Sequence, residues 1–468
     1  MKIVFIKVNM MYSKGRDALK PLVFALIEKL TPPEHELIFY DERIEALPDT
    51  LDADIIAFSV ETFAARHAYE LAEKYKRKDN LTVMGGFHPT AMEEEVLEHA
   101  DIVLKGDAED TWRQLMEDVS GEKADKSGFL PGHRIKRVYS SQNACHMSYV
   151  DPNSSCYRGK KYLPLAMIQA SRGCKFNCDF CSIKSLYPGD VRQKETGIVV
   201  REIRESREKL VFFIDDNLFF DEESAKALFK AIKPLKKKWA CQISLEIAFK
   251  DELLDMMYES GCFMVLIGLE SLNEDNLRIM KKSANIGIMR NGRENPLRET
   301  GRREGKNAAD DDIMHLEEAL KNIYRHNIMI YGMFVLGYDH DTAGSIKDTY
   351  EFAMRNNLTV ANFNPLMILP GTQLFLRMKE EGRLRFEKWW LDPSYRYGDA
   401  MYYPGSMSTE ELRDGCKSAR YDFNTWKNIF KRLLREKVNH RSLLNITVFL
   451  AINLISRSEI HRKQGKSL

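Results

Sequence analysis

The amino-acid sequence predicts an α/β protein: a doubly wound parallel sheet at the N-terminus, then a partial barrel of parallel strands, then a helical C-terminal region. Short apolar runs alternate with amphipathic stretches over residues 1–120, and the alternation begins again near residue 165. The chain has 468 residues, 44% hydrophobic and 30% charged, which suits folded domains with buried cores. We expect domains over 1–125, 164–375 and 376–468, with a polar connector at 126–163.

The first series of elements has the order of a doubly wound sheet, whose ligands gather at the carboxyl ends of the strands. Each strand is a short apolar run, and each helix has apolar residues at helical spacing. The predicted strands are Lys2–Val8, Glu36–Tyr40, Ile55–Val60, Leu81–Met84 and Ile102–Leu104, and the predicted helices are Ala18–Leu30, Ala64–Arg77 and Ala108–Asp118.

The second series contains six strand–helix units, too few for a closed eight-fold barrel. An open (β/α)6 barrel fits this count, with its site at the carboxyl-terminal mouth. Its predicted strands are Leu165–Ala170, Leu210–Ile214, Ala240–Leu245, Met264–Leu269, Met329–Leu336 and Val360–Ile368. The helices between them are Gly197–Lys209, Glu222–Lys236, Asp251–Glu259, Met314–His326 and Ser345–Asn356. Residues Ile286–Asp312 lack apolar periodicity and are predicted to be a mobile surface insertion.

Charge and apolar patterning exclude several classes of protein. A net charge of +1 argues against a nucleic-acid-binding protein. The N-terminus lacks a signal peptide, and no apolar run reaches the roughly 18 residues of a membrane-spanning helix. The eight cysteines do not form a disulfide framework in a chain this long, so we expect a cytoplasmic protein.

Three cysteines stand close together directly after an apolar strand: Cys174, Cys178 and Cys181, in C-x3-C-x2-C spacing. Three thiolates on one loop can hold three irons of a cubane cluster and leave the fourth iron open. A zinc site would usually need four ligands from two paired knuckles, and the sequence has no second C-x2-C. The triad therefore predicts a 4Fe-4S cluster.

This spacing, with an aromatic residue before the third cysteine, resembles the radical S-adenosylmethionine (SAM) superfamily. The resemblance implies that the open iron chelates SAM and that electron transfer through the cluster yields a 5′-deoxyadenosyl radical. It also implies that the ends of successive barrel strands contact SAM. The corresponding residues here are Phe180, Asp215, Asp216, Glu246, Gly268 and Glu270.

The N-terminal domain is similar to the cobalamin-binding domain that precedes one branch of radical SAM cores. The similarity rests on Met-Gly-Gly-Phe-His-Pro-Thr at 84–90 and Gly-Asp-Ala-Glu at 106–109. Asn9–Gly15, the loop after the first strand, lacks the histidine that binds cobalt elsewhere, so we expect cobalamin without a histidine below cobalt. His88 is expected to shape its loop rather than to bind cobalt. The implied cobalamin contacts are Ser59, Glu61, Thr62, Gly85, Gly86, His88, Gly106 and Glu109.

Together these resemblances imply a cobalamin-dependent radical SAM methyltransferase that acts on an unactivated carbon, loosely similar to the branch with the hopanoid C-2 methylase. An oxidative or ring-forming enzyme of the same architecture, and a non-catalytic cobalamin sensor, remain alternatives. The expected partners are a small-molecule or lipid substrate and an electron donor such as flavodoxin or ferredoxin. The apolar stretch Leu443–Ile455, with basic residues on both sides, is either a packed terminal helix or a peripheral contact with the inner membrane surface. Substrate and catalytic residues stay open.

Overall fold

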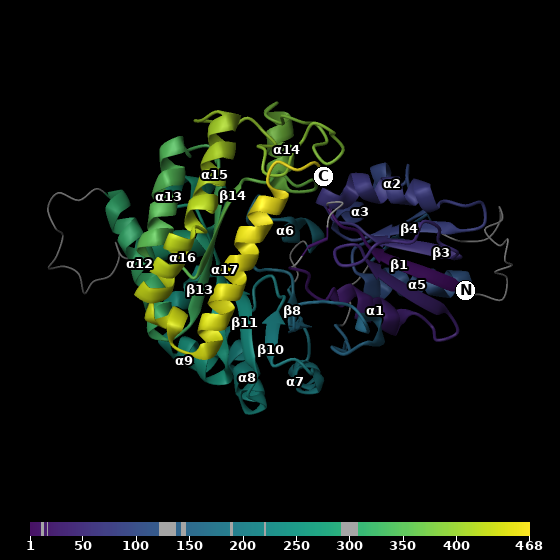
Figure 1. Cartoon of the computed structure of the whole chain (residues 1–468), viewed down its shortest axis with the longest axis horizontal. Coiled ribbons are helices and arrows are strands. Elements are labelled where there is room, and N and C mark those ends of the chain that lie inside the picture. The colour runs from purple at the N-terminus through teal and green to yellow at the C-terminus, as the bar shows by residue number, and fades with distance from the viewer. Residues whose placement is uncertain are drawn as a thin grey trace.

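Two six-stranded parallel sheets organise the chain, and they stand beside each other in the computed structural model (Figure 1). The structure describes residues 1–10, 14–15, 17–120, 137–141, 147–187, 191–219, 221–291 and 308–468. Both sheets were predicted, and so was the helical C-terminal region that follows them.

The first sheet has the strand order β2-β1-β3-β4-β5-β6. The chain adds β2 on one side of β1 and all later strands on the other side, so the strand order reverses between β1 and β3. Alternate residues of β1 face opposite sides: Ile3 and Phe5 pack in one buried cluster, Val4 and Ile6 in another. Because both faces are covered by helices, the strands are nearly continuous apolar runs. The strands are β1 Lys2–Lys7, β2 Glu36–Asp41, β3 Ile55–Ser59, β4 Leu81–Gly85, β5 Ile102–Lys105 and β6 Val138–Ser140. The helices are α1 Leu22–Leu30, η1 Thr62–Ala64, α2 Ala65–Tyr75, α3 Phe87–Ala91, α4 Glu93–Val96 and α5 Ala108–Ser120.

Two boundaries differ from the sequence prediction. Helix α1 begins at Leu22 rather than Ala18, because Pro21 precedes it and a proline is not tolerated in a helix interior. Strand β6 pairs with β5 although it lies within the predicted connector, so the first sheet reaches beyond residue 125. A three-residue strand in a polar stretch carries too little periodicity to be read from sequence.

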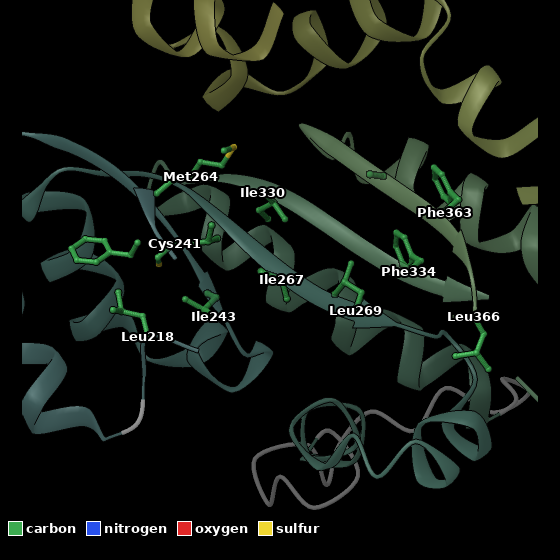
Figure 2. Packing of buried hydrophobic residues seen from close by; sticks show 14 of the residues in the cluster. Leu218, Cys241, Ile243, Met264, Ile267, Leu269, Ile330, Phe334, Phe363 and Leu366 are labelled. Atoms are coloured by element: carbon green, nitrogen blue, oxygen red, sulfur yellow. The ribbon is translucent and has the colours of Figure 1, made fainter. Parts of the chain in front are cut away.

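The second sheet has its strands in chain order, β7-β10-β11-β12-β13-β14, all parallel and open at both edges. Figure 2 shows Cys241, Ile267, Ile330 and Phe363, one from each of four successive strands, among the buried hydrophobic residues. The strands are β7 Leu165–Ile168, β10 Leu210–Phe213, β11 Lys238–Ile243, β12 Cys262–Glu270, β13 Met329–Leu336 and β14 Val360–Pro365. The helices between them are α7 Thr196–Glu205, α8 Glu222–Ile232, α9 Asp251–Ser260, α12 Ala308–Arg325 and α13 Ala343–Arg355, with 3-10 turns η3 Lys233–Leu235 and η4 Leu245–Phe249. A further 3-10 turn, η2 Ser155–Tyr157, precedes β7.

Several short helices and strands lie at the mouth of this barrel. An antiparallel hairpin of β8 (Ser171–Arg172) and β9 (Arg192–Gln193) encloses α6 (Ser182–Leu186). Helices α10 (Glu274–Ile279) and α11 (Ser283–Asn291) follow β12. Helices α11 and α12 therefore enter the predicted insertion at 286–312 from both sides, which corrects part of that prediction; residues 292–307 lie outside the described residues.

The C-terminal region covers the barrel and reaches back to the first sheet. It consists of α14 Gln373–Glu380, α15 Thr409–Phe423, α16 Trp426–Arg435, η6 Lys437–His440 and α17 Leu443–Lys463. Ser408 and Glu411 form a capping box that starts α15, and the Ser442 side chain caps α17. The Lys463 ammonium lies 3.1 Å from Asp17, so the end of α17 contacts the N-terminal domain.

Candidate active site at the mouth between the sheets

The three predicted cluster cysteines lie on the loop between β8 and α6, at the carboxyl edge of the second sheet. Cys181 is the N-cap of α6, and its amide donates to the Cys178 carbonyl at 3.3 Å. Among the described residues, no three His, Cys, Asp or Glu side chains converge on a single metal ion. The ligation of the cluster by the triad stays a prediction.

Residue Asp179 ties this loop to two other parts of the barrel. Its carboxylate accepts a hydrogen bond from the Tyr338 hydroxyl at 2.6 Å, and its carbonyl accepts from the Leu374 amide at 3.0 Å. Phe180 packs edge-on against Tyr338, with ring centroids 6.4 Å apart. Phe180 was predicted to contact SAM; the structure places it half-buried beside the thiols, where it also fixes the loop.

The thiols lie in partly buried surroundings that oppose their ionisation when no metal is bound. Burial raises the pKa of the Cys178 thiol to about 12 and raises the pKa of the Cys181 thiol above its usual value. Iron binding requires thiolates, so cluster assembly must release protons here.

The Asp-Asp turn after β10 holds the loop rather than presenting free carboxylates. Asp215 is buried and accepts hydrogen bonds from the Ala170 and Ser171 amides, and burial raises its pKa to about 6. Asp216 accepts from the Gly173 amide at 3.0 Å. These contacts position the segment that leads into Cys174. Direct contact of Asp215 and Asp216 with SAM stays a prediction.

The end of β12 brings two polar side chains together beside the thiols. Glu270 has a φ of +61°, unusual for a residue with a side chain, and its carboxylate meets the Lys282 ammonium at 2.8 Å. A Cβ on Gly268 would lie 2.1 Å from that carboxylate, so only glycine lets the Glu270 side chain fold back. Burial by itself would lower the pKa of Lys282, but Glu270 and the cysteines raise it, which keeps the ammonium charged. Lys282 was not identified from sequence, because a lysine after a helix carries no motif.

Other strand ends contribute polar atoms to the same mouth. Glu246, predicted to contact SAM, pairs with Lys175 of the thiol loop at 2.5 Å. The Asn217 amide nitrogen and the Ser244 hydroxyl are buried with no hydrogen-bond partner among the described residues. Buried polar groups without partners are rare, so these two atoms fit contacts with a bound polar ligand such as SAM.

A cavity of about 280 Å³ enters the first domain between its sheet and helices α1 and α5. Its deep walls are apolar and include Leu26, Ala57 and Trp112, which suits a flat, weakly polar group. Five of the predicted cobalamin contacts line it: Ser59, Gly85, Gly86, Gly106 and Glu109. Gly86 has a φ of +118°, and a Cβ there would lie 2.8 Å from the Val60 carbonyl, so the close turn beside the cavity requires glycine.

Three predicted cobalamin contacts do not line this cavity. Glu61 pairs with Lys7 at 2.5 Å, which lowers the pKa of Glu61, and Thr62 is buried in the turn η1. His88 is fully buried, and its Nε2 lies 2.9 Å from the Tyr69 hydroxyl and 3.3 Å from Glu95. The loop-shaping role expected of His88 agrees with these contacts, whereas direct contact with a ligand in the cavity does not.

The two candidate sites meet at Arg172, two residues before Cys174. Its guanidinium lies 2.6 Å from Asp107, in the loop after β5, and 2.9 Å from Glu109, in the first turn of α5. Arg192 also pairs with Asp107. Burial alone would raise the pKa of Asp107, but the two arginines hold it below its usual value. The cavity is lined on its outer side by Gln169, Arg172, Tyr187 and Ile214 of the barrel, so it opens toward the thiol loop.

Comparison with known families finds a match for each of the two domains. The model of the radical SAM superfamily matches residues 168–353, and the model of the B12 binding domain matches residues 30–116. The chain is 27% identical to a bacteriochlorophyllide d C-12(1)-methyltransferase of Chlorobaculum tepidum, over 92% of this chain and 88% of that protein. It is 24% identical to the hopanoid C-2 methylase of Rhodopseudomonas palustris, over 78% and 65% of the two chains.

One solved structure supports the arrangement of the two domains. The radical SAM methyltransferase TsrM of Kitasatospora setae, solved with cobalamin and a 4Fe-4S cluster, matches with a TM-score of 0.57 and 16% identity. The match covers 81% of this chain and 75% of that one, so it shows a shared fold across the two domains.

Proposed function

Since the chain belongs to the cobalamin-dependent radical SAM methyltransferases, we propose that it transfers a methyl group to an unactivated carbon of a small molecule. Its cofactors are a 4Fe-4S cluster, SAM and cobalamin. The match to the radical SAM superfamily makes the chain an enzyme, so the sensor alternative is not retained.

The observation that carries the proposal is the shared opening of the two candidate sites. One cavity is lined both by Gly106 of the first domain and by Arg172 of the barrel. A group bound in the first domain would therefore face the loop with Cys174, Cys178 and Cys181. Methyl transfer from cobalamin to a carbon activated at the cluster side needs this proximity.

Separate groups of residues are proposed to bind the cluster, SAM and cobalamin. We infer that Cys174, Cys178 and Cys181 hold the cluster and that Asp179 and Asp216 fix their loop. Polar groups at the ends of β10, β11 and β12 would hold SAM: Asn217, Ser244, Glu270 and Lys282. Ser59, Gly85, Gly86, Gly106 and Glu109 would hold cobalamin.

When bound, the cluster and SAM supply a radical that removes hydrogen from carbon, and cobalamin supplies the methyl group. The protein excludes water: the Arg172 ion pairs close the junction between the domains on one side. Lys282 holds a positive charge beside the thiol loop, which favours an anionic ligand group at that edge.

The finer identity of the substrate and partners is part of the proposal. The relatives named above act on bacteriochlorophyllide d and on hopanoids, so we propose a largely apolar substrate. The electron donor is proposed to be a flavodoxin or ferredoxin. We propose that the protein works in the cytoplasm.

The experiment is anaerobic reconstitution of the full chain with iron, sulfide and methylcobalamin, followed by incubation with SAM, a reductant and cell lysate. We expect 5′-deoxyadenosine and a lysate product heavier by one methylene. SAM cleavage with products that lose hydrogen and gain no methylene would instead establish the oxidative or ring-forming alternative. Absence of 5′-deoxyadenosine in a chain with a full complement of iron would overturn the proposal.

A further inference from the structure

Helix α16 turns a row of large apolar side chains to solvent. Trp426, Phe430 and Leu434 recur every four residues and are 50%, 48% and 71% exposed. The rings of Trp426 and Phe430 stack with centroids 6.2 Å apart. The adjoining side of the helix, with Ile429 and Leu433, is buried against the protein. We call these three side chains the Trp426 face. Because they are exposed, they contribute little to the buried core, and an exposed apolar row of this kind is typical of a contact surface.

Helix α17 lies beside α16, and it has polar side chains on its buried side and apolar side chains exposed to solvent. Its buried positions include Asn445 and Asn453, whereas Leu443 is 80% exposed. The Asn453 amide donates to the Thr359 carbonyl at 3.1 Å, and its oxygen accepts from Arg432 at 3.0 Å. The buried side of the helix thus combines polar side chains with Phe449, while Leu443 and Leu454 remain exposed to solvent.

Basic side chains border the Trp426 face. Residues 425–458 contain seven basic residues and one acidic residue, Glu436. Arg432 is buried, and the Arg457 guanidinium lies 5.7 Å from the centre of the Trp426 ring. The other five make no salt bridge to a described residue: Lys427, Lys431, Arg435, Lys437 and Arg441. A packed protein interface would leave this charge unbalanced, whereas an anionic surface would complement it.

Helix α17 has the length and composition to cross a membrane, which the sequence analysis did not expect. Its contacts favour a different position. The Asn445 amide donates to the Val438 carbonyl at 2.7 Å, and Lys463 at its end pairs with Asp17 of the first domain. Crossing a bilayer would break these bonds and place several polar side chains in hydrocarbon.

We propose that the Trp426 face and the solvent-exposed side of α17, which includes Leu443, dock on the surface of an anionic lipid bilayer. Trp426, Phe430 and Leu434 insert at the boundary between headgroups and acyl chains. Lys427, Lys431 and Arg435, each next in sequence to one of them, meet the anionic headgroups. Figure 1 shows α16 and α17 together on the near side of the barrel. The docking does not depend on the proposed methyl transfer.

The test is sedimentation of the reconstituted full-length protein with vesicles of phosphatidylglycerol and phosphatidylcholine, compared with phosphatidylcholine alone. We expect binding to the anionic vesicles at low salt, and weaker binding as salt is raised. The triple variant Trp426→Ser, Phe430→Ser, Leu434→Ser is expected to lose at least about tenfold in partition coefficient. The triple variant Lys427→Gln, Lys431→Gln, Arg435→Gln is expected to lose about a hundredfold at low salt.

Matched controls change equally exposed residues elsewhere. Leu376→Ser on α14, which is 55% exposed, and Lys347→Gln with Lys379→Gln are expected to bind as the unchanged protein does. Retained SAM cleavage by each variant shows that it is folded. Wild-type protein that stays in the supernatant with anionic vesicles at low salt would overturn the proposal. So would a dimer that the serine variant dissociates, because the face would then join two copies of the chain.

Discussion

The Arg172 guanidinium and the Glu109 carboxylate lie 2.9 Å apart and join the two domains at the point where both candidate cofactor sites open. Both side chains are almost completely buried, so the pair lies outside the screening of solvent. Glu109 lines the cavity of the first domain, and Arg172 stands two residues before Cys174. The position of the thiol loop is therefore fixed by the first domain as well as by the barrel.

Replacing Arg172 by Met is expected to destabilise the protein by about 3–5 kcal/mol, because the carboxylates of Asp107 and Glu109 lose a buried partner. The measurement is chemical unfolding of the variant and of the double variant Arg172→Met, Glu109→Gln, which should recover part of the loss. Arg413→Met, which removes an exposed pair with Asp414, should change stability by less than about 1 kcal/mol. Equal effects of the two arginine changes would contradict the structural role of the buried pair.

Replacing Cys178 by Ala is expected to remove most of the bound iron, the visible absorbance of the cluster and all SAM cleavage, because a cubane with an open iron needs three thiolates. Iron content and 5′-deoxyadenosine are measured after anaerobic reconstitution. Cys416→Ala serves as the control, since Cys416 is on the buried side of α15 and is not part of the thiol loop. A Cys178→Ala variant that still cleaves SAM would show that the triad is not the ligand set.

Cobalamin is expected to bind without a protein nitrogen below cobalt, because the loop at 9–15 contains no histidine and His88 is enclosed by Tyr69, Glu95 and Trp390. Residues 11–13 of that loop lie outside the described residues. The electron paramagnetic resonance spectrum of bound cob(II)alamin should show no nitrogen splitting from a lower ligand. His88→Ala should leave this spectrum unchanged while lowering stability; nitrogen splitting that the variant abolishes would refute this assignment.

Glu95 is expected to make stability fall in acid. Burial alone would raise its pKa, but hydrogen bonds from His88, Trp390, Lys388 and Tyr69 lower the pKa of Glu95 to about 2. A carboxyl with a lowered folded-state pKa stabilises the fold above its unfolded pKa of about 4.3 and loses that contribution as the pH falls toward 2. Compared with Glu95→Gln, the unchanged protein should lose about 2 kcal/mol more between pH 5 and pH 2, after an allowance for solvent screening. Parallel pH curves for the two proteins would show that Glu95 is not coupled in this way.

The sequence alone predicted the two sheets and the cofactor classes. Strands β1 and β12 are apolar runs bounded by polar turns. Such local patterns can be recognised in a sequence before the fold is known. The spacing of Cys174, Cys178 and Cys181 is equally local, because all three lie on one loop. Strand β6 and the β8–β9 hairpin were not predicted, since each has too few residues to show a period.

What only the tertiary structure decided is which polar side chains face the site and which hold the protein together. Asp215 and Asp216 follow β10 as a ligand-binding pair would, and in the structure their oxygens accept hydrogen bonds from backbone amides of residues 170–173. Lys282, Arg172 and Asn217 carry no sequence motif, and they reach the mouth only because separate strands end at the same edge. The partner of a buried polar group is chosen by packing between distant segments, whereas periodicity and cysteine spacing are properties of neighbours in the chain. For that reason the sequence by itself determined the elements and the cofactors, and the fold determined the contacts.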